Sequence, residues 1–341
     1  MKIAIMHSAK KRNNARSNLG LGLEKGFASI PDVEVIMAQD MYEMSLGTHR
    51  IPKDVSAIIL PYWISEKIWE NDIWKLRESF PNVPILVYTG TSPYWHGCNW
   101  VDFDPGTKEL TPKFSGNALK SFNAVDAYMV VRPRGRIKPS NQYAVGMGLF
   151  EEIKPPENKP ATPCVIVDFF KRGWDESQYR NSLITALESV KDIPKSTVAV
   201  LGNPPNDLVG DILSEQKVRV FFGEHHNWSM ILGLIKGAWA MVSLNESFGY
   251  SIVESFGCGT QVFADTSCEI PAFHNLIEPL EKLSTYMHQM YEISQHETGL
   301  NDMAKLVKDG WESSNQDLVS WNTCARNVMD VINQVIFSKQ S

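Results

Sequence analysis

Two glutamates, Glu246 and Glu254, are separated by seven residues in the segment WAMVSLNESFGYSIVESFGCGTQVFAD, residues 239–265. The apolar runs at its start and near its end are typical of buried parallel strands, and the stretch between them has the spacing of a helix that begins near Gly249. Open parallel sheets place ligand sites at such strand-to-helix turns, because the helix end offers N–H groups and a positive dipole end that suit a phosphate. Two solvated glutamates beside an ordinary helix would give the same pattern.

The residue order in this segment resembles the signature of retaining nucleotide-sugar glycosyltransferases with the two-domain GT-B fold, especially the large family 4. The matching positions are Glu246, Phe248, Gly249, Glu254, Gly257, Gly259 and Val262. The resemblance implies that Glu246 lies beside the donor sugar, that Glu254 bonds the ribose, and that the diphosphate is held by the backbone amides of Gly249, Tyr250 and Ser251. The spacing agrees, because Glu246 would lie on the turn and Glu254 about a turn and a half inside the helix.

The composition limits the class of protein. A chain of 341 residues suits two domains, and a net charge of -6 provides no global basic field for nucleic acid or anionic lipid. No apolar run approaches the ~18 residues that a membrane-spanning helix needs. Five cysteines are scattered without metal-ligand spacing, which favours a reduced setting. We therefore expect a cytoplasmic protein without a membrane span.

The first half of the chain alternates strand-like and helix-like patterns. Strands are predicted at residues 2–6, 33–37, 57–60, 84–88 and 125–131, and the alternation indicates a parallel, doubly wound sheet. The loop after the first strand, HSAKKRNNARSNLGLG, is the most basic window and contains Gly20, where a ligand could approach the backbone closely. In the resembled fold this loop lines the cleft and meets the acceptor or the donor phosphate. A solvated surface loop is the alternative.

The loop after the fourth strand, TGTSPYWHGCNW, contains His96. Family 4 enzymes often carry a histidine here near the reacting sugar, so the resemblance implies a catalytic position for His96. Aromatic rings make suitable platforms for sugar faces, so Tyr94, Trp95 and Trp100 could help to hold an acceptor. The alternative is a loop packed by its own aromatic rings, in which His96 is merely hydrogen-bonded.

The second half restarts the same alternation, with strands predicted at residues 164–169 and 197–201 around a helix at 178–190. The loop FFKRGWDE supplies Lys171 and Arg172, and the resemblance implies that one of them faces the donor diphosphate. A transferase without metal needs such cations because the leaving diphosphate gains charge. An inert exposed pair of charges is the alternative. The resemblance also places Gly202 and Asn203 in a turn near the nucleobase.

Four prolines between Pro155 and Pro163 disfavour regular structure and indicate a linker between domains. We expect an N-terminal acceptor-side domain at residues 1–153 and a nucleotide-sugar-binding domain at residues 154–319. A C-terminal helix at 320–341 is expected to cross back to the first domain, because Ser320-Trp321 resembles the pair that opens this helix in many relatives.

These features predict an α/β protein with the GT-B fold, in which two Rossmann-like doubly wound domains face one another across a cleft. The resemblance implies retaining transfer of a sugar from a nucleoside diphosphate sugar to a saccharide or lipid-linked acceptor, without cofactor or bound metal. Two alternatives stay open. The basic loops loosely resemble phage glucosyltransferases that modify hydroxymethylated DNA bases. The chain could also be a catalytically silent sugar-nucleotide-binding module, because Thr260 stands where relatives usually have proline.

Overall fold

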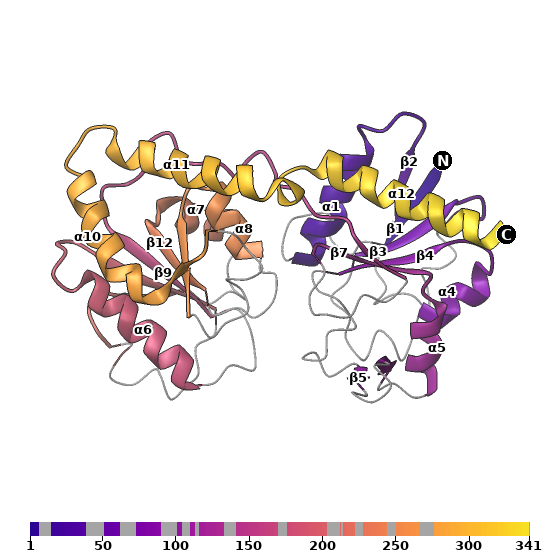
Figure 1. The fold of residues 1–341 in the computed structure, drawn as a ribbon, viewed down its shortest axis with the longest axis horizontal. Coiled ribbons are helices and arrows are strands. Elements are labelled where there is room, and N and C mark those ends of the chain that lie inside the picture. Colours follow the sequence, from indigo (N-terminus) through magenta and orange to yellow (C-terminus); the bar gives the residue numbers. More distant parts are fainter. Residues whose placement is uncertain are drawn as a thin grey trace. The chain divides into compact units, whose positions relative to one another are not determined.

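The chain forms two compact units (Figure 1). The computed structural model describes residues 1–6, 15–38, 51–61, 73–89, 101–103, 110–112, 116–132, 141–169, 176–202, 212, 214–221, 228–243, 250–265 and 276–340. Unit 1 comprises Met1–Gly148 and Asp317–Ser341, and unit 2 comprises Leu149–Gln316. The boundaries between the units therefore lie after Gly148 and after Gln316. The sequence predicted these boundaries after residues 153 and 319.

Unit 1 contains a six-stranded, all-parallel sheet with the order β2-β1-β3-β4-β7-β8. Its strands are β1 (Lys2–Met6), β2 (Glu34–Ala38), β3 (Ala57–Pro61), β4 (Ile85–Thr89), β7 (Ala127–Val130) and β8 (Gln142–Ala144). Every side chain of β3 and β7 is buried, as expected for parallel strands whose two faces are both covered. The five strands predicted for this half are confirmed, and β8 joins them at the edge.

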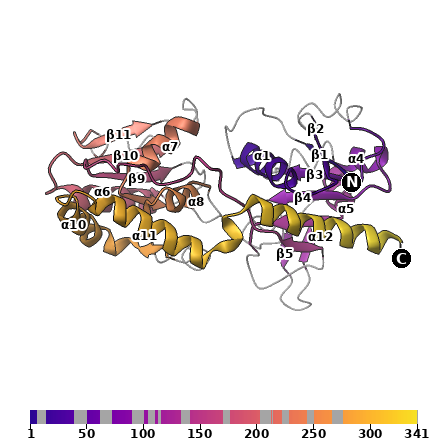
Figure 2. The same ribbon diagram turned by 90° about the horizontal axis from the view of Figure 1, so that it is seen from above.

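The described helices that pack on this sheet are α1 (Ala15–Phe27), α4 (Ile73–Ser79), α5 (Gly116–Ala124) and α12 (Trp321–Gln340). A short antiparallel pair, β5 (Val101–Phe103) and β6 (Leu110–Pro112), lies outside the sheet. Helices α4 and α5 lie side by side, and α12 packs along α1 (Figures 1 and 2). The α1–α12 contact is close because Gly22 has no side chain: a Cβ there would lie 2.1 Å from the Trp321 ring.

The start of α12 is anchored within unit 1 by Asp317. Arg132 donates through Nε and Nη2 to the two carboxylate oxygens of Asp317 at 2.6 and 2.5 Å, a two-point pairing that fixes orientation as well as distance. The amide of Met147 donates to the Asp317 carbonyl at 2.8 Å. Gly146 next to it has a φ of +71°, and a Cβ there would lie 2.2 Å from the same carbonyl oxygen.

Unit 2 contains a second six-stranded parallel sheet, with the order β11-β10-β9-β12-β13-β14. Its strands are β9 (Cys164–Phe169), β10 (Thr197–Gly202), β11 (Val218–Phe221), β12 (Ala240–Ser243), β13 (Gln261–Ala264) and β14 (Glu278–Pro279). Numbered along this unit alone, the order reads 3-2-1-4-5-6, which is the Rossmann order. The strand, turn, helix and strand predicted for residues 239–265 are present as β12, α8 and β13.

The helices of unit 2 cover both faces of its sheet. In the described residues they are α6 (Glu176–Val190), α7 (Trp228–Gly237), α8 (Tyr250–Gly257), α10 (Leu283–Ile293) and α11 (Gly299–Ser314). Of two short 3-10 turns, η6 (Leu280–Lys282) leads directly into α10, and η7 (Gln316–Leu318) lies where the chain passes from unit 2 to unit 1. Helices α6 and α10 lie on one face, where Leu183 and Met287 join Val165 and Val200 in the core, and α7 and α8 lie on the other (Figures 1 and 2).

Both units are therefore Rossmann-like and doubly wound. Among the helices of the ranges given above, none combines the length and the apolar character that crossing a membrane requires.

Candidate functional site

The carboxyl ends of β9, β10 and β12 meet at one edge of the unit 2 sheet. β9 pairs with β10 on one side and with β12 on the other. The helices that follow β9 and β12 are α6 and α8, and they cover opposite faces (Figure 2). This arrangement is a topological switch point, where open α/β sheets form their ligand-binding crevice.

Helix α8 begins at this edge, at Tyr250, which confirms the predicted helix start near Gly249. The hydroxyl of Ser251 donates to Oδ2 of Asp168 at 2.6 Å. Asp168 is the penultimate residue of β9 and is only 4% exposed. The bond therefore ties the first turn of α8 to the carboxyl end of β9, across the switch point.

The buried Asp168 carboxylate determines which charges this edge can accommodate. It lies favourably near the positive end of the α8 dipole, but its own charge repels a phosphate. Its effect reaches α6, where burial, with a smaller contribution from Asp168, raises the pKa of Tyr179 above its usual value. A diphosphate bound here would therefore need cationic side chains close by.

Glu254 lies one helical turn beyond Ser251 and is also buried, at 4% exposure. Its Oε1 accepts a hydrogen bond of 2.6 Å from Nε1 of Trp228, the first residue of α7. The carboxylate is thus held between α7 and α8, inside unit 2. A solvated glutamate on an exposed helix face, the alternative for Glu254, does not describe this position.

Glycines of the motif have structural reasons to be glycine. Gly202 ends β10 with a φ of +106°, a conformation that residues with a Cβ rarely adopt. Gly257 ends α8 where a Cβ would lie 2.6 Å from Ile153 Cγ2, and Gly259 has a φ of +69° against the backbone of Ala304. Gly20 is buried inside α1. Ligand contacts at Gly20 and Gly202 stay predictions.

Several predicted site residues lie outside the part of the chain that the structure describes. They are His96, Lys171, Arg172, Asn203, Glu246, Phe248 and Gly249. Their roles, and that of Glu254 toward a ribose, stay predictions. Within the described ranges, sequence reasoning missed Asp168 and Trp228. Asp168 had a signal, since it is the charged residue in the apolar run CVIVDF; Trp228 had none.

Thr260, the residue in place of the usual proline, has a structural function. Its amide donates to the Ser255 carbonyl at 2.8 Å, and its hydroxyl donates to the Ile235 carbonyl at 2.8 Å. Proline could make neither bond. The same hydroxyl accepts from Nζ of the buried Lys159 at 3.0 Å, and that ammonium also donates to the Gly259 carbonyl at 3.2 Å. This departure from the motif therefore needs no loss of function to explain it.

Lys159 makes the stability of the protein depend on pH. Burial lowers the pKa of Lys159 to about 8, from 10.5. Between these values the unfolded chain binds more protons than the folded chain, so the free energy of unfolding rises with pH. From pH 7 to pH 9 we expect the wild type to gain about 1 kcal/mol relative to Lys159→Met, measured by urea unfolding at each pH.

The range ends at pH 9 because two neighbouring thiols act in the opposite direction above it. Burial raises the pKa of Cys164 to about 11 and that of Cys258 to about 12. Each buried thiol therefore lowers the free energy of unfolding only as pH rises above the pKa of an ordinary thiol. A difference in the free energy of unfolding between wild type and Lys159→Met that stays constant from pH 7 to pH 9 would contradict the lowered pKa of Lys159.

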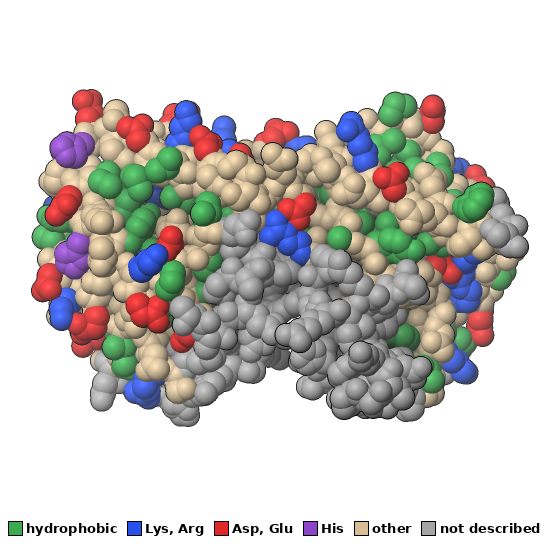
Figure 3. Space-filling model, in the orientation of Figure 1, with side chains coloured by type: hydrophobic (Ala, Val, Ile, Leu, Met, Phe, Trp, Pro, Cys, Tyr) green, Lys and Arg blue, Asp and Glu red, His purple; other side chains and the backbone are tan. Residues whose placement is uncertain are grey.

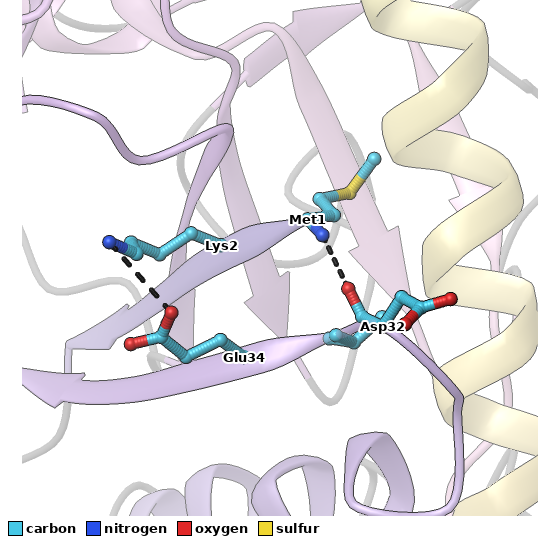
Figure 4. Close-up of a pocket in the computed structure, with 5 residues that line it drawn as sticks. Met1, Lys2, Asp32 and Glu34 are labelled. Atoms are coloured by element: carbon cyan, nitrogen blue, oxygen red, sulfur yellow. Dashed lines mark hydrogen bonds and ion pairs between the residues drawn. The ribbon is translucent and has the colours of Figure 1, made fainter.

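A surface hollow of about 420 Å³ lies in unit 1, lined by Met1, Lys2, Asp32, Val33 and Glu34 (Figure 4). Its polar groups bind one another: the amino group of Met1 donates to the Asp32 carbonyl, and Lys2 Nζ lies 3.8 Å from Glu34. Lys2 also donates to Asp54 at 2.6 Å. The hollow lies at the amino ends of β1 and β2, opposite the edge where parallel sheets bind ligands.

Comparison with known proteins identifies the fold. No family model matches the sequence, and no curated protein matches it. Sucrose-phosphate synthase from Thermosynechococcus elongatus matches with a TM-score of 0.59 and 14% identity, over 99% of each chain. An alpha-glucosyltransferase in complex with UDP and a 13-mer DNA containing an HMU base matches with a TM-score of 0.59 and 10% identity, over 98% of this chain and 99% of that chain.

A TarM variant from S. aureus, in complex with Fondaparinux, alpha-GlcNAc-glycerol and UDP, matches with a TM-score of 0.54 and 11% identity over 86% of this chain. The chain spans 58% of the length of that TarM structure. These likenesses confirm the predicted fold: the protein has the GT-B fold, with two Rossmann-like domains.

Proposed function

We propose that the protein is a glycosyltransferase that moves a sugar from a nucleoside diphosphate sugar to a hydroxyl acceptor with retention of configuration. The observation that carries the proposal is the start of α8. It lies at the switch point of a Rossmann-order sheet, and the buried Glu254 follows one turn later. The helix end suits a diphosphate, and a buried carboxylate suits the hydroxyl groups of a ribose.

The proposal gives the remaining residues roles in one reaction. Backbone amides from Gly249 to Ser251 bind the diphosphate, and Lys171 or Arg172 offsets its charge and that of Asp168. Glu246 stabilises the positive charge that develops on the sugar, with His96 nearby. The acceptor hydroxyl attacks from the face on which the diphosphate leaves, and the departing diphosphate takes the hydroxyl proton. The C–O bond to the diphosphate breaks as the new glycosidic bond forms.

The acceptor in this proposal is a saccharide or a lipid-linked glycan. DNA is the second candidate, because the match to the alpha-glucosyltransferase in complex with DNA extends over nearly the whole of both chains. On the face in Figure 3, basic and acidic side chains of the described residues are interspersed, which supports the first candidate. Duplex DNA that binds at low salt and is released at about 200 mM salt, and that accepts sugar, would establish the second.

The proposal includes a cytoplasmic setting and a reaction without cofactor or bound metal. The three described cysteines, Cys164, Cys258 and Cys324, are free thiols, which supports a reduced setting. The sequence has one Asp-x-Asp stretch of the kind that can bind a metal-nucleotide complex, Asp102-Phe103-Asp104, in and after β5. Transfer activity that survives excess EDTA would support metal independence, and loss that Mn²⁺ restores would overturn it.

Ligand-induced stabilisation tests the proposal directly. A ligand that binds only the folded state at 100 times its Kd stabilises it by about 2.7 kcal/mol. For domains of this size that corresponds to a rise in Tm of about 5–10 °C. We expect at least one nucleoside diphosphate sugar to produce such a rise in a thermal-shift screen. Failure of all common donors and of their free nucleotides would overturn the proposal.

Donor turnover then separates an enzyme from a silent binding module. A glycosyltransferase hydrolyses its donor slowly when no acceptor is present, because water reaches the activated sugar. We expect chromatography of the stabilising donor to show release of the nucleoside diphosphate over hours. Tight binding without release, with or without acceptor mixtures, would favour the module.

A further inference from the structure

The position of Glu254 is costly for the fold. Every residue of α8 from Ile252 to Gly257 is buried, and the flanking side chains of Val253 and Phe256 are apolar. A carboxylate in such surroundings loses its hydration, so it destabilises the folded state unless hydrogen bonds replace the lost water. An apolar residue would pack here at less cost. The carboxylate therefore indicates a requirement other than stability.

One partner of Glu254, the indole of Trp228, has an informative chemistry. The Trp228 indole donates one hydrogen bond of 2.6 Å and carries no charge. It therefore orients the carboxylate but leaves its negative charge in place, whereas a lysine or arginine would neutralise that charge. A carboxylate accepts up to about four hydrogen bonds, so the same group can also receive bonds from a ligand with adjacent hydroxyl groups.

Trp228 is well placed to hold that orientation. It is the first residue of α7, a helix anchored by the buried Leu232 and Ile235 and packed against α8. An indole has two rotatable side-chain bonds, so holding it still costs little conformational entropy. The flexible glutamate side chain is thereby fixed by a rigid group on a neighbouring helix.

We propose that Trp228 is a positioning residue that holds Glu254 in the orientation in which its carboxylate binds the ribose hydroxyls of a nucleoside diphosphate. This inference rests on the proposed function, and it goes further by identifying what makes the site discriminate ribose. It predicts that loss of the indole N–H removes the contribution of the ribose hydroxyls and leaves binding of the diphosphate intact.

Calorimetric titration of the full chain tests this inference. The wild type is titrated with UDP, GDP and ADP, and the tightest ligand is compared with its 2′,3′-dideoxy analogue. We expect the wild type to prefer the ribonucleotide by about tenfold or more. In Trp228→Phe that preference should fall to about twofold, while the Kd of the dideoxy analogue changes by less than about twofold. Trp228→His, which keeps a ring N–H, should restore part of the preference.

A double-mutant cycle shows whether Trp228 acts through Glu254. In a Glu254→Ala background, Trp228→Phe should reduce the ribose preference no further. Should Trp228→Phe fail to fold, a benzothienyl analogue of tryptophan incorporated at position 228 keeps the shape and removes the N–H. If Trp228→Phe weakens binding of the ribonucleotide and of its dideoxy analogue equally, or leaves the preference between them unchanged, this inference is overturned and the proposed function is not. A wild type that binds neither these three nucleotides nor any donor or nucleotide of the thermal-shift screen overturns the proposed function, and this inference with it.

Discussion

Gly259→Ala is expected to lower the free energy of unfolding of unit 2 by about 4 kcal/mol. Gly259 has a φ of +69°, where a side chain costs about 1–2 kcal/mol. An added Cβ would lie 2.3 Å from the Ala304 carbonyl oxygen and 2.7 Å from its carbonyl carbon. Because these are backbone atoms of α11, a rotamer change cannot relieve the overlap, and overpacking adds about 1–3 kcal/mol. Urea unfolding monitored by tryptophan fluorescence measures the loss.

Substitutions at two other glycines separate the cost of the positive φ from the cost of the overlap with Ala304. Gly116 also has a positive φ, +59°, but a Cβ there meets nothing within 4 Å, so Gly116→Ala should cost only the backbone term. Gly233, inside α7, has open space and no positive φ, so Gly233→Ala should stabilise the protein by up to about 1 kcal/mol. A loss in Gly259→Ala no larger than in Gly116→Ala would contradict the close approach of α11.

Glu246→Ala is expected to reduce kcat for sugar transfer about a thousandfold, with little change in the Kd of the nucleoside diphosphate. In the proposed reaction Glu246 acts on charge that develops at the sugar only in the transition state. Glu254→Ala should act differently, raising KM and the nucleotide Kd about tenfold or more, because the ribose is bound equally in both states. Initial rates and calorimetry on the same preparations measure the two effects.

A matched substitution on the surface provides the control. Glu292 is exposed on α10, so Glu292→Ala should leave kcat, KM and the nucleotide Kd unchanged. If Glu246→Ala weakened nucleotide binding and spared kcat, the proposed assignment of the two carboxylates would be reversed. If both variants behaved like Glu292→Ala, neither carboxylate would belong to the site.

Much of the fold could be predicted because it follows from short-range patterns. Apolar runs separated by helical spacing indicate parallel strands covered by helices, and both sheets have this form. The predicted helix start near Gly249 agrees with Tyr250 for the same reason, since glycines and the change of period mark it locally. The need for glycine at position 259 was visible only as a motif; its cause, the backbone of Ala304, comes from a different helix.

The sequence by itself therefore determined the two doubly wound sheets and the strand, turn and helix around Glu254, because hydrophobic period and turn residues act over a few positions. Only the tertiary structure decided which polar groups meet there. Ser251 and Asp168 are 83 positions apart, Lys159 and Thr260 are 101 apart, and Trp228 meets Glu254 across 26. Such pairs depend on strand order and on how helices pack, and neither is encoded in local periodicity.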